Sequence, residues 1–200
     1  MVDIVIRRLV KDCVKDCVNG VSLVCAAPIA AASGFGRIKT AYTFFAHFCA
    51  LLPGGPGDYL RRAYYHLTLN GFPMSSRISF GSFFSHSDAR VGCNVYIGSY
   101  CVLGKVDIGA GTQIASGVQI LSGQHQHVRD PSGAVFHEGE FVMVTIGFDC
   151  WIGASAVVMA RVGDRSTIVA GSVVTRQIPS DSVAVGSPAR VIRTTEAISR

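Results

Sequence analysis

A six-residue repeat runs through the C-terminal half of the chain, and it constrains the fold more than any other feature. Each repeat begins with Ile or Val, usually has Gly or Ala second, and mostly carries a small or β-branched residue fifth. In a prism of short parallel strands, the aliphatic residue fills the interior, the fifth residue fits beside it, and the second lies where the chain turns a corner. The period excludes helical structure for this half. The repeats are VGCNVY from Val91, IGSYCV from Ile97, IGAGTQ from Ile108, IASGVQ from Ile114, IGFDCW from Ile146, IGASAV from Ile152, VGDRST from Val162, IVAGSV from Ile168 and VTRQIP from Val174.

Composition narrows the classes of function. An apolar content of 49 % provides enough material for a core. The net charge is only +5, and the aromatic residues are not interleaved with Lys or Arg, so nucleic acid is excluded as a partner. The seven Cys include no C-x-x-C pair, which indicates a reducing compartment and neither a disulfide framework nor a zinc ribbon. Cys101 and Cys150 fall at the fifth repeat position, and we interpret them as packing residues, not nucleophiles.

The N-terminal residues 2–18 predict a basic amphipathic helix. At helical spacing, Arg7, Arg8, Lys11 and Lys15 share one side, and apolar residues share the other. Such a helix is typical of a membrane-surface or partner-docking element, but an ordinary helix that covers the rest of the protein has the same pattern. Both interpretations remain open.

Two apolar stretches follow, Val21–Ala32 and Ala41–Leu52, and they predict a helical hairpin. Each is shorter than the roughly 20 residues needed to span a bilayer, so the hairpin either packs on the protein or enters one leaflet. The basic region before the first stretch also permits a secretory signal, although Pro28 interrupts the apolar run. A further helix is expected over residues 58–69, after the break PGGPG.

The repeats resemble the hexapeptide-repeat acyltransferase superfamily. Between Val144 and Arg193, the segments VTIGFDCWIGASAVVM, IVAGSVVTRQIP and VAVGSPARVIR are similar to the galactoside, maltose and antibiotic acetyltransferase branch. The segments LPGGPGDYLRRAYYHLTL and FFSHSDARVG look like the sugar O-acetyltransferases of surface-polysaccharide synthesis. The resemblance implies a mainly β fold, a left-handed parallel β-helix with an α-helical N-terminal region, assembled as a homotrimer that uses acetyl-CoA as donor.

The expected organisation has three parts. Residues 1–75 form a helical region that associates with a membrane in one interpretation, residues 76–193 form the β-helix domain, and residues 194–200 form a tail. The six-residue repeat is interrupted over residues 123–143. A loop of this length inside a strict repeat indicates a function.

The loop carries the expected catalytic residues. In the resembling family it begins with the catalytic His, a role that falls on His125. A neutral imidazole suits the deprotonation of an acceptor hydroxyl that attacks the thioester directly. Glu138, with Glu140 in reserve, is expected to hold the other ring nitrogen. His127 is expected on the acceptor side. His125 and His127 form an H-x-H pair, but no third ligand is evident, so no metal is expected.

The resemblance also places the donor and the acceptor. Trp151 corresponds to a position that the family turns toward the acceptor, although packing at a coil corner is the alternative. At Gly98 the galactoside branch has an Asn that contacts the sugar, so acceptor identity does not transfer. The family's CoA contacts correspond to Ala154 and Ala170 along the pantetheine arm and to Thr175, Arg176, Arg190 and Arg193 toward the phosphates.

The expected function is acyl transfer from acyl-CoA to a sugar hydroxyl in polysaccharide or lipid-linked glycan synthesis. The enzyme is expected in the cytoplasm, with peripheral contact at the inner face of the plasma membrane. Two alternatives stay open: acetylation of a small diffusible hydroxyl compound such as an antibiotic or free sugar, and a non-catalytic β-helix assembly module.

Overall fold

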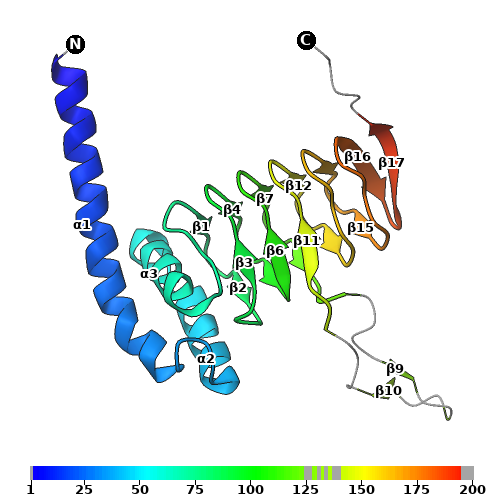
Figure 1. Cartoon of the computed structure of the whole chain (residues 1–200), viewed down its shortest axis with the longest axis horizontal. Coiled ribbons are helices and arrows are strands. Elements are labelled where there is room, and N and C mark those ends of the chain that lie inside the picture. The colour runs from blue at the N-terminus through cyan, green and yellow to red at the C-terminus, as the bar shows by residue number, and fades with distance from the viewer. Residues whose placement is uncertain (1, 124–127, 130–131, 133–134, 137–140, 195–200) are drawn as a thin grey trace.

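Three helices precede a long coil of short strands (Figure 1). The computed structural model describes residues 2–123, 128–129, 132, 135–136 and 141–194. The helices are α1 (Val2–Ala32), α2 (Lys39–Ala50) and α3 (Gly54–Thr68). They gather at one end of the coil, and the chain reaches the other end near its C-terminus.

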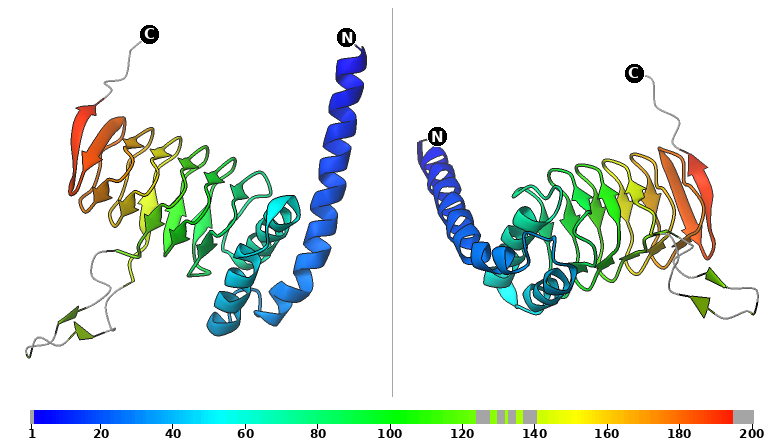
Figure 2. Two further views of the ribbon diagram at one scale, coloured as in Figure 1. Left: turned by 180° about the vertical axis from the view of Figure 1, so that it is seen from behind. Right: turned by 60° about the horizontal axis from the view of Figure 1, so that its bottom comes forward.

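The strands form three parallel sheets, which are the three faces of a prism (Figures 1 and 2). The chain visits face 1, face 2 and face 3 in turn, so consecutive strands lie on different faces and strands of successive coils pair in register. Face 1 contains β1 (Arg77–Ile78), β4 (Tyr96–Ile97), β7 (Gln113–Ile114), β12 (Trp151–Ile152), β14 (Thr167–Ile168) and β16 (Ser182–Gly186), closed by the antiparallel β17 (Ala189–Thr194). Face 2 contains β2 (Phe83–Phe84), β5 (Val102–Leu103), β8 (Gln119–Ile120), β13 (Val157–Val158) and β15 (Val173–Val174). Face 3 contains β3 (Arg90–Val91), β6 (Val106–Ile108) and β11 (Val144–Ile146), continued by single bridges at Val162 and Ile178.

The first residue of each repeat builds the core. On face 1, Ile97 pairs with Ile114, Ile114 with Ile152, and Ile152 with Ile168, and all four are fully buried. Parallel strands stack identical positions, so one aliphatic side chain per face and coil makes a continuous interior ladder. The fifth positions lie beside this ladder and are also buried.

The second and fourth repeat positions have different tasks, which corrects the interpretation of the second position as the corner. A Cβ on Gly153 would lie 2.4 Å from the backbone N of Ala170 on the next coil, so this glycine is required for close approach. The left-handed backbone that turns the corner falls at the fourth position, where Gly and a few polar residues tolerate it. Positive φ occurs there at Asn94, Tyr100, Gly111, Gly117, Asp149, Ser155, Arg165 and Gly171.

The N-terminal region differs from the expected hairpin. The basic segment and the first apolar stretch form one 31-residue helix, α1, with Pro28 inside its last turns. Within it, Cys13–Ala32 has the length and composition of a membrane span, and only 17 % of its most apolar stretch is buried. The apolar segment is therefore longer than the predicted stretch Val21–Ala32, because the helix continues it back to Cys13. A signal sequence near an N-terminus would meet the same two criteria.

A buried arginine joins the helices to the coil. Arg61 of α3 is completely buried and donates hydrogen bonds to the carbonyl oxygens of Cys49 (2.9 Å), Leu52 (2.7 Å) and Ile78 (3.2 Å). It also pairs with Asp58 one turn away. Arg61 thus adds a buried donor to carbonyls at the end of α2 and in β1, which ties these two elements together.

Candidate functional site

All departures from the six-residue period fall on one edge of the prism. From face 1 to face 2, Ile114 and Ile120 are six residues apart, and the same spacing holds in every coil. From face 2 to face 3, the spacing varies, from Phe84 to Val91, from Leu103 to Ile108 and from Val158 to Val162. We call this edge, with the described residues 85–89, 104–105, 121–123, 141–143, 159–161 and 175–177, the loop edge. Insertions concentrate where the coil does not need a fixed length, and such places carry function.

The longest excursion leaves this edge after β8, which ends at Ile120, and returns at β11, which begins at Val144. Within it, β9 (Val128–Arg129) and β10 (Val135–Phe136) form an antiparallel pair. In Figure 1 this pair lies well away from the coil. The expected base His125, the expected acceptor residue His127 and the expected carboxylate Glu138 lie outside the described residues. Their roles therefore stay predictions.

The base of the excursion is tied to the preceding coil. Val142 donates its backbone N–H to the Ser122 carbonyl at 3.0 Å, and Val144 donates to the Lys105 carbonyl at 2.9 Å. Ser122 also accepts a hydrogen bond from the Lys105 backbone N–H at 2.8 Å through its buried hydroxyl. These bonds hold both ends of the loop on the coil, so the first residues of the loop have a fixed starting position.

A histidine outside the excursion, His86, lies on the loop edge and was missed by sequence reasoning. The His86 ring contacts the ring of Phe141, with centroids 5.3 Å apart, and its Nδ1 is 2.9 Å from the Ser85 hydroxyl oxygen. Burial lowers the pKa of His86, while the nearby Asp88 opposes that shift. The ring is thus biased toward the neutral form that a general base requires. Phe84 and Val91 are seven positions apart instead of six, and this irregular spacing was the signal that could have revealed His86.

An ion pair flanks this histidine. Lys105 Nζ lies 3.1 Å from one carboxylate oxygen of Asp88, and both residues belong to the loop edge. The other carboxylate oxygen of Asp88 is buried and has no hydrogen-bond partner among the described residues. The edge therefore presents an imidazole, a hydroxyl, a carboxylate and an ammonium group from two successive coils.

The expected donor residues lie in three places within one chain. Ala154 and Ala170 are exposed and stack on successive coils at the edge between faces 1 and 2, where the Ala154 carbonyl accepts the Gly171 N–H at 2.8 Å. Thr175 and Arg176 follow β15 on the loop edge. The last two, Arg190 and Arg193, are exposed on β17, which extends face 1. Two of the three places flank face 2 on opposite sides.

The acceptor-side residues are also located. Trp151 is 53 % exposed in β12, where it pairs with Gln113 and Thr167, so it does not pack at a coil corner. Gly98 is buried, and a Cβ there would lie 2.6 Å from the backbone N of Ser116. That position has no room for a side chain and makes no side-chain contact to an acceptor.

Two of the cysteines lie in the core of the coil. Cys101 and Cys150 are buried, and burial raises the pKa of each thiol, which confirms their interpretation as packing residues.

Across the part of the chain that the structure describes, no group of three His, Cys, Asp or Glu side chains is placed to hold a metal ion. The described groups suit proton transfer and hydrogen bonding.

Sequence comparisons match the repeats on both sides of the excursion. Residues 88–122 match the family model "Bacterial transferase hexapeptide (six repeats)", and residues 143–176 match "Hexapeptide repeat of succinyl-transferase". The galactoside O-acetyltransferase of Escherichia coli K12 is 50 % identical over 52 residues, which are 25 % of this chain and 26 % of that protein. The chain spans between 26 % and 57 % of the length of the curated relatives that it matches. The predicted resemblance to hexapeptide-repeat transferases is confirmed.

Solved structures show the same architecture. A maltose O-acetyltransferase from Clostridium difficile 630 superposes with a TM-score of 0.63 at 24 % identity, covering 80 % of this chain and 89 % of that one. A galactoside acetyltransferase in complex with coenzyme A gives a TM-score of 0.60 at 22 % identity, covering 79 % and 82 %. At these identities the likeness concerns the fold. It confirms the predicted left-handed parallel β-helix with N-terminal helices.

Proposed function

We propose that this hexapeptide-repeat chain transfers an acetyl or similar acyl group from acyl-CoA to a hydroxyl of a sugar. The observation that carries the proposal is the interruption of the coil at the loop edge, between two segments that match transferase repeats. The coil itself has no need of this excursion, and the relatives that match the repeats carry acetyltransferase names.

The proposed mechanism is direct attack on the thioester. His125 takes the proton of the acceptor hydroxyl as its oxygen forms a bond to the acyl carbon, and Glu138 orients the imidazole. Backbone N–H groups hold the tetrahedral oxyanion until the C–S bond breaks and the CoA thiolate leaves and is protonated. No acyl-enzyme is formed, which agrees with the buried, high-pKa thiols of Cys101 and Cys150.

The donor is proposed to lie between two chains. Ala154 and Ala170 would meet the pantetheine arm through backbone groups, while Thr175, Arg176 and the two arginines of β17 would approach the nucleotide phosphates. A linear donor that reaches both edges of face 2 must either cross that face or lie between neighbours. Arginine suits phosphate because its forked donors make charge-assisted hydrogen bonds.

A homotrimer would supply the neighbour. The outward side chains of face 2 support self-association, because they form an in-register ladder that is largely apolar: Phe83, Val102, Gln119, Val157 and Val173. A closed three-fold ring buries such a ladder on every copy. Face 3 is more polar at the corresponding positions, with Arg90, Asp107 and Thr145.

The acceptor is proposed to be a glycan or its lipid-linked precursor in the cytoplasm, with the enzyme held peripherally at the membrane. Support comes from the exposed apolar side chains of α1, among them Val14 (57 % exposed), Val21 (64 %) and Val24 (75 %). With basic residues on the same helix, this surface suits an anionic leaflet. A diffusible acceptor such as an antibiotic or free sugar is the competing proposal.

One experiment separates these possibilities. Purified full-length protein is incubated with acetyl-CoA and either free sugars, glycans or lipid-linked sugars, and CoA thiol release and the mass of the product are followed. We expect release that depends on a sugar acceptor and a product that carries one added acyl group. Transfer to free sugars alone would favour the diffusible acceptor, and no release with any acceptor would favour a non-catalytic module.

A further inference from the structure

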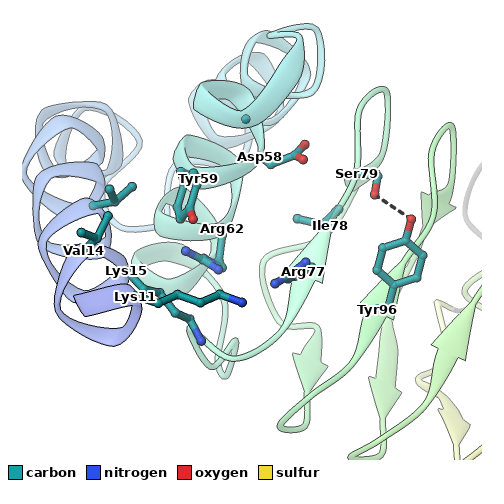
Figure 3. Close-up of a pocket in the computed structure, with 12 residues that line it drawn as sticks. Lys11, Val14, Lys15, Asp58, Tyr59, Arg62, Arg77, Ile78, Ser79 and Tyr96 are labelled. Atoms are coloured by element: carbon teal, nitrogen blue, oxygen red, sulfur yellow. Dashed lines mark hydrogen bonds between the residues drawn. The ribbon is translucent and has the colours of Figure 1, made fainter. Parts of the chain in front are cut away.

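A basic cavity lies between the helices and the first coils of face 1, the face that does not border the loop edge. It has a volume of about 740 Å³ and is bounded by α1, α3, β1 and β4. Figure 3 shows Lys11 and Lys15 reaching from α1, Arg62 from α3 and Arg77 from β1 toward the same space. Tyr59 and Tyr96 complete its walls.

Arg62 is the unusual member of this cavity. Its side chain is only 5 % exposed, yet its Nε has no hydrogen-bond partner among the described residues. The guanidinium donates to the Asn19 side-chain oxygen and lies over the Tyr59 ring at 4.6 Å. Burial lowers the pKa of Arg62 and Arg77 lowers it further, while Tyr59 and Asp58 oppose the shift. A buried cation without a directly paired carboxylate is costly, so the site favours a negatively charged occupant.

The charged groups around the cavity form no ion pair with Arg62 among the described residues. The ion pairs in the described part of the chain are Arg61–Asp58, Lys105–Asp88 and Arg165–Asp181, so none involves the four basic residues of the cavity. Asp58 is the carboxylate on the cavity wall, and it pairs with Arg61. Two ammonium and two guanidinium groups around one space match the oxygens of a phosphate.

An apolar groove continues from the basic cavity along the same two helices. It has a volume of about 510 Å³ and shares Val18, Gly55 and Tyr59 with the basic cavity. Its further lining includes Val21 and Cys25 of α1. At a rise of 1.5 Å per residue, the helix between Val18 and Cys25 runs for about 10 Å, enough for a short length of hydrocarbon chain.

We propose that the basic cavity and the apolar groove together bind one phosphate-headed lipid, with the head on Arg62 and Arg77 and the chain between α1 and α3. Charge complementarity places the phosphate, and the adjoining apolar lining places the hydrocarbon. This site goes beyond the proposed acyl transfer and uses none of its catalytic or donor residues, but it shares Val14 and Val21 with the apolar surface of α1. It also differs from attraction of a whole helix to a membrane surface, because it holds a single molecule in a defined place.

The test is calorimetric titration of the full chain, without acyl-CoA, with dihexanoyl phosphatidic acid below its critical micelle concentration. Parallel titrations use inorganic phosphate and dihexanoyl phosphatidylcholine. We expect phosphatidic acid to bind at least about tenfold more tightly than either, because only it offers both the anionic head and the chain. Equal binding of inorganic phosphate would overturn the lipid assignment, and absence of phosphatidic acid binding, as when a second copy fills the groove, would overturn the site.

Two variants locate the binding. Arg77→Gln combined with Lys15→Gln should weaken phosphatidic acid about tenfold, since charged hydrogen bonds are lost from exposed residues. Val21→Asp should weaken phosphatidic acid but leave the affinity for inorganic phosphate unchanged. Arg37→Gln removes an exposed cation outside the cavity and should change neither. Wild-type affinity in both cavity variants, with folding verified by circular dichroism, would contradict the proposal.

Discussion

His86 and Phe141 meet at the loop edge although they lie far apart in the sequence. Their contact depends on the irregular spacing of one edge and on the return path of the excursion, neither of which a repeat pattern specifies. The proposed base, His125, comes by contrast from a motif, because the end of a strict repeat marks where the loop begins. A motif of this kind allows a role to be proposed from sequence, as for His125, whereas neighbours across coils give no such signal.

The pKa of His86 leads to a prediction about stability. Burial lowers this pKa below the value of about 6.5 expected in the unfolded chain, so the unfolded state binds the proton more readily. The free energy of unfolding should therefore fall as pH decreases through about 6.5. Urea unfolding at about pH 7 and pH 5 should show a larger loss for the wild type than for His86→Asn. Equal losses in the two proteins would contradict this account.

Arg190 tests the proposed donor site. Its replacement by Ala should raise the Michaelis constant for acetyl-CoA more than it lowers turnover, because phosphate contacts remote from the thioester bind ground and transition states alike. Calorimetry with CoA measures the same loss directly. CoA affinity equal to that of the wild type would make Arg190 a solvated residue of β17.

At the scale of elements, the hexapeptide coil was predictable and the N-terminal helix was not. Ile or Val at every sixth position can be buried together only when the chain coils with one such residue on each face. The local pattern and the fold therefore agree. The join between the basic segment and the first apolar stretch was missed because the residue pattern changes there from amphipathic to uniformly apolar, while the helix continues. Pro28 lies four residues from the C-terminal end of α1, and the helix continues through it with the loss of the one hydrogen bond that a residue at this position would donate to the Val24 carbonyl.

Close packing between coils gives a second stability prediction. Gly153→Ala should lower the free energy of unfolding by about 1–3 kcal/mol, because its Cβ would lie 2.4 Å from the Ala170 backbone. Gly20→Ala is the matched control. Gly20 lies inside α1 with nothing within 4 Å of an added Cβ, so this change should be neutral or stabilising. Equal destabilisation by the two variants in urea would contradict the account of the second repeat position.

Arg61 should hold the helical region to the coil. Arg61→Met leaves the carbonyls of Cys49, Leu52 and Ile78 without their buried donor, and we expect a loss of about 3 kcal/mol or more. Arg37→Met, at an exposed position, should cost less than about 0.5 kcal/mol. A small effect at Arg61 in urea unfolding would mean that packing alone joins α2, α3 and β1.

For the whole molecule, the account requires a neighbour at face 2. Val157→Asp introduces a charge into the apolar ladder and should shift the protein from trimer to monomer in light scattering at micromolar concentration. Thr145→Asp, on the polar face 3, should leave the mass unchanged. A monomeric wild type would remove the basis for a donor site between chains.

The residues of the proposed donor site come from distant parts of the molecule, and for this reason their arrangement could not be predicted. The donor residues carried over from the resemblance occupy both edges of face 2 and the terminal strand, an arrangement that sequence order alone does not reveal. The basic cavity with Arg62 likewise forms only when α1, α3 and β1 come together.

The central claim is acyl transfer with His125 as base, and turnover of two matched variants tests it most directly. CoA thiol release with a sugar acceptor should fall by a factor on the order of 10² to 10⁴ in His125→Ala, while CoA affinity stays nearly unchanged. His127→Ala, two residues along the same loop, should cost much less. A larger loss at His127 than at His125, or wild-type turnover in both variants, would contradict the account.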